Sequence, residues 1–246
     1  FSLISALRAI GVQTILTSHS TQVTSQVPLS SIVSLTKRDD ATIAAGNLAL
    51  NAALTAPEIA DLERYLDATK SALLYARKVM LVEGPAEMFL IPALIEQVYG
   101  VKLERLGISV IAIHGVHFGV YAKLFRAGSL EKKCAIVADA DMKPSDAEDF
   151  DPETDAPDLA ALESDLVSTF AGATTFEREL VSVGRLPMLI ETVRALGAPQ
   201  ILAQMENGFA TLVLGGLGLA EETALRVELG RITLNTAKRF GKARFA

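Results

Sequence analysis

The sequence KVMLVEGPAE occupies residues 78–87 and joins an apolar pentapeptide to two glutamates. The first five residues have the length and the apolar content of a buried strand. Gly84 allows a tight turn, and Pro85 suits the first turn of a helix because its missing N–H would have no partner there anyway. The stretch therefore predicts a strand that ends at Glu83 and a helix that places Glu87 one turn further on.

Two further apolar runs follow at residues 108–113 and 133–138, and Asp139 and Asp141 come directly after the second run. Helical patterns separate these runs. Strands that alternate with helices at this spacing predict an α/β fold with a parallel sheet flanked by helices. A shorter β-rich run at 13–17 predicts one more strand.

The carboxylates at the ends of these strands form a candidate metal site. Because the carboxyl ends of parallel strands meet at one edge of a sheet, we expect Glu83, Glu87, Asp139 and Asp141 to converge there. Oxygen ligands of this kind hold hard cations such as Mg²⁺ or Mn²⁺. Taken singly, each residue could also have a role without a metal. Glu87 could lie on a solvated helix face, and the two aspartates could begin an acidic loop.

The net charge of −6 is unevenly distributed along the chain. Between Asp139 and Asp165 there are eleven acidic residues and one basic residue, whereas the last 24 residues hold six basic residues and one acidic residue. A basic C-terminal segment is compatible with a nucleic-acid partner. On one continuous helix Arg231, Lys238 and Lys242 would form a basic stripe, although a solvated helix face is the common explanation of such a stripe.

Composition excludes several classes of protein. The single cysteine, Cys134, rules out a disulfide framework and a cysteine-based zinc site. No apolar run approaches the roughly 20 residues that span a bilayer, and the N-terminus lacks the pattern of a secretory signal. We therefore expect a cytoplasmic protein. Because the chain begins in the middle of a pattern, we also expect it to be part of a longer one.

Two segments, 81–87 and 137–141, together resemble the Toprim signature, a strand-terminal glutamate followed by a later Asp-x-Asp. Topoisomerases, bacterial primases and several nucleases share this signature. Residues 14–20, TILTSHS, resemble the end of an ABC-type ATPase domain, where a strand leads into a switch histidine, here His19. An ABC-type ATPase that runs directly into a Toprim domain is similar to the OLD (overcoming lysogenization defect) family of nucleases.

The resemblance implies further site residues. TTFEREL at 174–180 is similar to the family segment that carries another acidic ligand, which corresponds to Glu177. KARFA at 242–246 is similar to the family's Lys-x-x-Phe-Ala segment, whose lysine serves the active site. The implied catalytic residues are Lys242, Glu83 and Asp139. The implied metal ligands are Glu83, Glu87, Asp139, Asp141 and Glu177, and Arg231 and Lys238 are expected to bind DNA.

The function implied is a DNA endonuclease that hydrolyses phosphodiester bonds with two Mg²⁺ or Mn²⁺ ions. ATP would act only through the missing ATPase domain, which could also form a homodimer. Two alternatives stay open: a Toprim module that binds DNA or protein without cutting, and another Toprim enzyme. A primase would need a zinc-binding module and a topoisomerase a nucleophilic tyrosine on a separate domain, so these two enzymes fit less well.

The sequence predicts four regions. Residues 1–40 would end the ATPase domain, 41–55 would be a linker, 56–182 the Toprim catalytic domain, and 183–246 an additional C-terminal helical domain. The stretch Ser145–Pro157, rich in Asp, Glu and Pro, is expected to be a loop outside the metal site.

Overall fold

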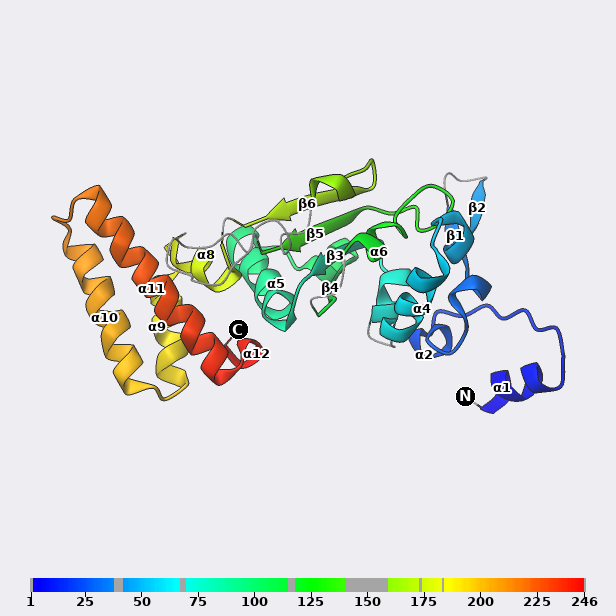
Figure 1. The fold of residues 1–246 in the computed structure, drawn as a ribbon, viewed down its shortest axis with the longest axis horizontal. Helices are drawn as coiled ribbons and strands as arrows, with labels where there is room; N and C mark the ends of the chain where they lie inside the picture. The colour runs from blue at the N-terminus through cyan, green and yellow to red at the C-terminus, as the bar shows by residue number, and fades with distance from the viewer. Residues whose placement is uncertain are drawn as a thin grey trace.

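The structure is a computed structural model, and it describes residues 2–37, 42–66, 70–114, 118–139, 159–172, 174–182 and 184–245. Asp141 and the predicted acidic loop lie outside these ranges. In Figure 1 the N-terminal segments, a central sheet and the C-terminal helices follow one another along the long axis of the molecule. The sheet therefore lies between two groups of helices.

Four parallel strands form the central sheet, in the order β4-β3-β5-β6. Val79 pairs with Cys134 and Val82 with Val137, so the two strands that lead to the candidate carboxylates are neighbours and end level. The predicted α/β class and the three predicted strands are confirmed. The strands are β3 (Lys78–Val82), β4 (Ile108–Ala112), β5 (Cys134–Ala138) and β6 (Val167–Ala171).

Strand β6 was not predicted from the sequence. Its residues VSTFA include two adjacent polar residues, and three of the five side chains are exposed because the strand lies at the edge of the sheet. An edge strand lacks the continuous apolar run that marks a central one. The strand matters for the site because α8 (Phe176–Ser182) follows it and starts at the same edge of the sheet.

Helices connect the strands as expected for a parallel sheet. The helix α5 (Pro85–Tyr99) follows β3, and Pro85 is its first residue, as predicted. A 3-10 turn, η3 (Leu103–Leu106), leads into β4. After β4 comes α6 (Phe118–Ala122), which is shorter than the helix predicted at 118–127. Another short turn, η4 (Ala160–Leu162), precedes β6.

The N-terminal part contains short helices and a two-stranded antiparallel sheet. The strand predicted at residues 13–17 is wrong, because this segment has no regular secondary structure and Ile15 is 90% exposed. No strand among the described residues pairs with it. The elements of this part are α1 (Ser2–Ala9), α2 (Thr21–Thr24), η1 (Leu29–Ser31), β1 (Val33–Lys37), β2 (Ile43–Asn47), α3 (Leu48–Asn51), α4 (Ala56–Tyr65) and η2 (Lys70–Leu74).

His19, the histidine of the ATPase-like segment, contacts the part of the chain that leads into the sheet. Its ring lies edge-to-face against Tyr75, with 6.2 Å between ring centroids. The Tyr75 hydroxyl donates a hydrogen bond to the carbonyl oxygen of Ser20, at 3.3 Å. Tyr75 follows η2 and lies three residues before β3.

The segment expected as a linker, 41–55, is folded against the sheet. Leu48 of α3 is fully buried, and it belongs to the same hydrophobic core as Leu81 and Ile136 of the central strands. The small and apolar residues of α3 therefore serve packing rather than flexibility.

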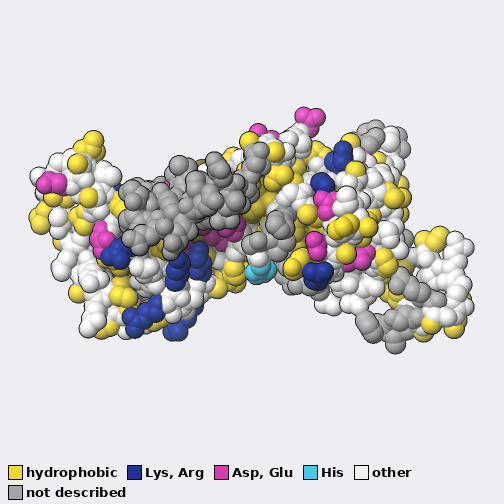
Figure 2. All heavy atoms as spheres, in the orientation of Figure 1, with side chains coloured by type: hydrophobic (Ala, Val, Ile, Leu, Met, Phe, Trp, Pro, Cys, Tyr) yellow, Lys and Arg dark blue, Asp and Glu magenta, His cyan; other side chains and the backbone are white. Residues whose placement is uncertain are grey.

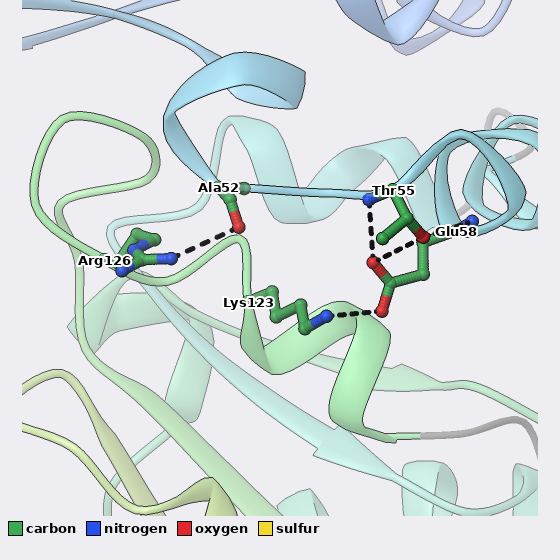
Figure 3. A network of polar contacts seen from close by, with 5 residues as sticks. All are labelled: Ala52, Thr55, Glu58, Lys123 and Arg126. Atoms are coloured by element: carbon green, nitrogen blue, oxygen red, sulfur yellow. Dashed lines mark hydrogen bonds and ion pairs between the residues drawn. The ribbon is translucent and has the colours of Figure 1, made fainter.

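Polar contacts join the next helix to α6 (Figure 3). At the start of α4 the Glu58 carboxylate accepts hydrogen bonds from the Thr55 N–H and hydroxyl, at 2.9 and 3.0 Å. Lys123, directly after α6, forms an ion pair with Glu58. Arg126 donates to the carbonyl oxygen of Ala52, at 3.3 Å. These contacts fix the N-terminal segments on the sheet domain.

A buried lysine ties together the approaches to the two central strands. The Lys132 ammonium group, two residues before β5, donates to the carbonyl oxygens of Leu73, Leu74 and Ala76 at 3.2, 2.9 and 2.7 Å. The accepting residues end η2 and precede β3. The entrances of β3 and β5 are thereby held together at the end of the sheet opposite the candidate site.

The C-terminal helices form a second hydrophobic core around Leu189, Met205 and Leu229, and Leu90 and Leu94 of α5 pack against it. The additional helices predicted for the C-terminal region are confirmed. The observed elements are α9 (Leu186–Ala195), α10 (Pro199–Leu214), α11 (Leu219–Phe240) and α12 (Lys242–Phe245). In the described part of the chain, none of the helices has the length and apolar character needed to cross a membrane.

Leu48→Ala tests the packing of the expected linker. Removing a fully buried leucine side chain leaves a cavity, so we expect the free energy of unfolding to fall by about 2–5 kcal/mol in urea titrations. Leu50→Ala on the same helix is the matched control, because Leu50 is 76% exposed and should change stability by less than about 0.5 kcal/mol. Equal, small effects from both substitutions would contradict the buried placement of α3.

The pH dependence of stability tests Lys132. Burial lowers the pKa of Lys132 from 10.5 to about 8. The unfolded chain then binds more protons than the folded one between these pH values, so this group makes stability rise with pH across that window. Lys132→Met should remove this rise in urea unfolding at pH 7.5–10, whereas Lys133→Met at the exposed neighbouring position should keep it. A rise of unchanged size in Lys132→Met would contradict the depressed pKa.

Candidate metal centre

Glu83 and Asp139 lie side by side at the carboxyl edge of the sheet. Glu83 directly follows β3 and Asp139 directly follows β5, and these two strands are hydrogen-bonded neighbours. The Asp139 N–H donates to Oε1 of Glu83, at 2.8 Å. This hydrogen bond, from a main-chain N–H to a side-chain oxygen, links the two predicted residues where their strands end.

Asp139 receives a second contact from the other side. The N–H of Phe176, the first residue of α8, donates to Oδ1 of Asp139, at 2.9 Å. The contact exists because β6 pairs with β5 and delivers the start of α8 to the same edge. The Asp139 side chain is therefore held between two elements that are far apart in the sequence.

Glu87 lies in the first turn of α5 and is buried, with 5% of its surface exposed. Its Oε2 accepts a hydrogen bond from the N–H of Gly84, at 3.0 Å. The contact caps the start of the helix and holds the carboxylate back toward the end of β3. The alternative of a solvated Glu87 is thereby excluded.

The buried Glu177 and the half-buried Lys242 form an ion pair beside these carboxylates. Glu177 is 2% exposed, and the Lys242 ammonium lies 3.0 Å from its Oε1 and 3.3 Å from its Oε2. The glutamate comes from α8 and the lysine from α12. Helix α12 also packs against α5, the helix that carries Glu87.

The basic stripe predicted for one continuous helix is wrong at Lys242. Helix α11 ends at Phe240, and Gly241 adopts φ 90°, a value in the region that favours glycine, so the chain changes direction there. Lys242 starts α12 and faces Glu177 instead of continuing the stripe. Phe245, one turn later, is buried in the core of the C-terminal helices and holds α12 in place.

The electrostatics of the cluster are dominated by carboxylates. Burial, and after it the negative charges of Glu83, Glu87 and Glu177, raise the pKa of Asp139 to about 7, against the lowering effect of Lys242. For Lys242, burial lowers the pKa, but Glu177, Asp139 and Glu87 outweigh this effect and raise it above its usual value. The lysine is therefore a charged ammonium group that offsets only part of the negative charge.

This donor set fits a hard divalent cation by its chemistry. It consists of carboxylate oxygens in a partly buried place with an excess of negative charge. The Oε1 atom of Glu177 is buried and accepts no hydrogen bond. Within the described ranges, however, no three His, Cys, Asp or Glu side chains surround a common point at metal-binding distance, and Asp141 lies outside those ranges.

The structure thus brings together Glu83, Glu87, Asp139, Glu177 and Lys242 from the residues selected in the sequence. Arg231 and Lys238 lie elsewhere, on the exposed surface of α11. Figure 2 shows Lys and Arg side chains gathered on the face formed by the C-terminal helices, next to acidic side chains near the centre of the molecule.

Residues 74–141 match the family described as "Overcoming lysogenization defect protein-like, TOPRIM domain". This segment is similar to an OLD-like Toprim domain. The matched segment includes four of the candidate ligands, Glu83, Glu87, Asp139 and Asp141. The match supports a Toprim module of the nuclease type, and Toprim domains generally bind divalent metal ions.

Two solved structures are similar to the chain. The C-terminal region of the Burkholderia pseudomallei OLD protein is 24% identical, with 69% of this chain and 84% of that chain covered and a TM-score of 0.44. The C-terminal region of the Xanthomonas campestris pv. campestris OLD protein is 24% identical, with 70% of this chain and 82% of that chain covered and a TM-score of 0.45. No curated protein is significantly similar in sequence.

Sequence reasoning missed the backbone contribution to this OLD-like Toprim site. The N–H of Phe176 that holds Asp139 could be anticipated only from the pairing of β6 with β5, and β6 has no clear strand pattern. The direction of Lys242 was missed as well, although Gly241 in the sequence was an available signal for the end of the helix.

Metal binding to the OLD-like Toprim site should stabilise the fold. Millimolar Mg²⁺ or Mn²⁺ should raise the melting temperature, because a ligand that binds only the folded state adds about 2.7 kcal/mol at 100 times its Kd. Asp139→Asn and Glu177→Gln should each reduce this shift, and Glu191→Gln on α9, outside the cluster, should not. If neither ion changes the melting temperature of the unsubstituted protein, the carboxylates do not form a metal centre in the free protein.

Proposed function

We propose that this chain hydrolyses phosphodiester bonds of DNA as an endonuclease that depends on two Mg²⁺ or Mn²⁺ ions. The observation that carries the proposal is the convergence of Glu83, Glu87, Asp139 and Glu177 around the Lys242 ammonium group. Buried carboxylates without enough positive charge cost stability, and a divalent ion is the partner that removes this cost. The OLD-like Toprim match supports the same reaction class.

The residues divide into two sets of ligands under this proposal. Asp139, with Asp141 and Glu83, would hold one ion, and Glu87 and Glu177 would hold the other. When bound, such ions supply an activated water and stabilise the departing oxygen. The hydrogen bonds from the N–H groups of Asp139 and Phe176 keep the Glu83 and Asp139 carboxylates in place before any ligand arrives.

Lys242 would act on the phosphate rather than on the ligands. Because its pKa is raised by Glu177 and its neighbours against the effect of burial, the side chain keeps its positive charge at neutral pH. Glu177 holds the ammonium group at the edge of the carboxylate cluster. A fixed positive charge at this position stabilises the negative charge that develops on the phosphate in the transition state.

The DNA backbone would lie on the basic surface of the C-terminal helices. Lys238 is exposed on the last turn of α11 and remains a proposed DNA-binding residue. Arg231 is held by Glu228 through two contacts of 2.8 and 2.6 Å, so it would first have to release this carboxylate. Exposed pairs of this kind are worth about 0–1 kcal/mol, so the exchange costs little. A role for ATP, a homodimer and a cytoplasmic location likewise remain proposals.

The second candidate is a Toprim module that binds DNA or protein without cutting. Buried, incompletely neutralised carboxylates speak against it, because a binding scaffold gains nothing from them. The two functions differ in a direct assay. Conversion of a supercoiled plasmid to the nicked form in the presence of Mg²⁺ or Mn²⁺ supports the nuclease, and stable binding without nicking supports the binding module.

Substitutions should separate chemistry from binding in the nicking assay. Asp139→Asn should lower the nicking rate by about 100-fold or more, because it removes a ligand charge and a fixed contact. Lys242→Ala should lower the rate by about 100-fold while the affinity for DNA changes little, as for an interaction made chiefly in the transition state.

Lys238→Ala is the comparison, since a residue that only binds backbone phosphate should weaken affinity and leave the rate at saturating DNA unchanged. Equal, mild losses of affinity in Lys242→Ala and Lys238→Ala would remove Lys242 from the mechanism.

A further inference from the structure

Polar atoms without partners gather at the start of α8. In the described part of the chain, two buried side-chain atoms within residues 175–178 have neither a hydrogen-bond nor an ion-pair partner: Oγ1 of Thr175 and Nε of Arg178. Folded proteins pair nearly all buried polar atoms, so such a group of exceptions calls for a ligand or a function. Glu177 has its ion pair with Lys242, whereas Arg178 is a cation that the site described above does not use.

Arg178 is a half-buried arginine that belongs to the same helix as Glu177. It follows Glu177 in the first turn of α8. Among the residues that the structure describes, no carboxylate lies within ion-pair distance of it and no acceptor binds its buried Nε. Leaving a buried donor unpaired costs about 1–3 kcal/mol, more for a charged group.

Three other arginines of the C-terminal helices have acidic partners. Arg226 pairs with Glu222 one turn earlier on α11, at 2.8 Å. Arg194 and Arg231 are similarly paired, with Glu191 and Glu206 and with Glu228. Some arginines of this region form no ion pair in the described part, but among the described arginines Arg178 is the one with a buried nitrogen that lacks an acceptor.

Helix α11 leaves space for the Arg178 side chain. A Cβ atom at Gly230 would lie 3.3 Å from Cγ and 3.6 Å from Cβ of Arg178. Gly230 is buried in the interior of α11, where glycine costs roughly 0.5–1 kcal/mol relative to alanine. The absence of a side chain at this position lets the stem of Arg178 cross the helix surface, so packing fixes the direction of the guanidinium.

We infer that Arg178 binds a phosphate of the DNA backbone next to the carboxylate cluster, in a role that rests on the proposed nuclease function. A guanidinium group offers parallel N–H donors that match two oxygens of one phosphate. The phosphate supplies the acceptors and the negative charge that Arg178 lacks in the protein. Lys242 and Arg178 would then hold the DNA backbone at two places.

Arg178→Met tests this role, because methionine keeps much of the apolar stem and removes the guanidinium. Affinity for a short fluorescein-labelled DNA duplex is measured by anisotropy in EDTA, where no cleavage occurs, at several salt concentrations. We expect the variant to bind about tenfold more weakly, with the slope of log K against log salt reduced by about 0.9, the value for one lost phosphate contact. Its melting temperature should not fall, since no protein partner is lost.

Arg226→Met is the matched control, since Arg226 is an acid-paired arginine of the same helical layer, and it should bind within twofold of the unsubstituted protein. Affinity and salt slope unchanged in Arg178→Met, or a loss of nicking without a loss of affinity, would overturn the role of Arg178 while the nuclease function stands. If the unsubstituted protein neither binds nor nicks DNA, the proposed function fails and the role of Arg178 with it.

Discussion

The structure depends on a concentration of negative charge at one edge of a parallel sheet. Two neighbouring strands end in Glu83 and Asp139, and the first turns of two helices add Glu87 and Glu177. Coulomb repulsion between such groups is strong in a partly buried place, and it is expressed in the pKa of Asp139, which burial and the neighbouring carboxylates raise to about 7. In the described part of the chain, fixed N–H groups and Lys242 offset part of this repulsion.

The single lysine also explains how the two halves of the molecule are joined. Lys242 belongs to the last helical turn, and Glu177 belongs to the helix that follows the edge strand, so their ion pair closes the C-terminal helices onto the carboxylate cluster. Apolar contacts support the same arrangement, because Leu90 and Leu94 of α5 pack against the core of these helices. Helix α5, whose first turn carries Glu87, therefore contacts both β4 of the sheet and the core of the C-terminal helices, and movement between these two parts would alter the cluster.

The central part of the fold could be predicted because three of its strands are strongly apolar. Residues 79–82, 110–113 and 134–138 form continuous apolar runs, and a parallel sheet then places Glu83 beside Asp139. Edge strand β6 has no such run, so the contact between Phe176 and Asp139 was invisible in the sequence. The segment at 13–17 has residues that favour a strand, and a strand was predicted there. No described strand pairs with this segment, and strand propensity without a partner strand does not make a strand.

The spacing of the final motif follows from the geometry of one helical turn. Residues three apart lie on the same side of a helix, so Lys242 and Phe245 both face inward once α12 forms. Phe245 enters the core of the C-terminal helices and fixes the turn, and Lys242 then reaches Glu177. If α11 continued without interruption, Lys242 would instead extend the exposed stripe that contains Arg231 and Lys238. Gly241 breaks that direction with its positive φ, and so the break in the helix, rather than the charge pattern along it, places the ammonium group at the carboxylates.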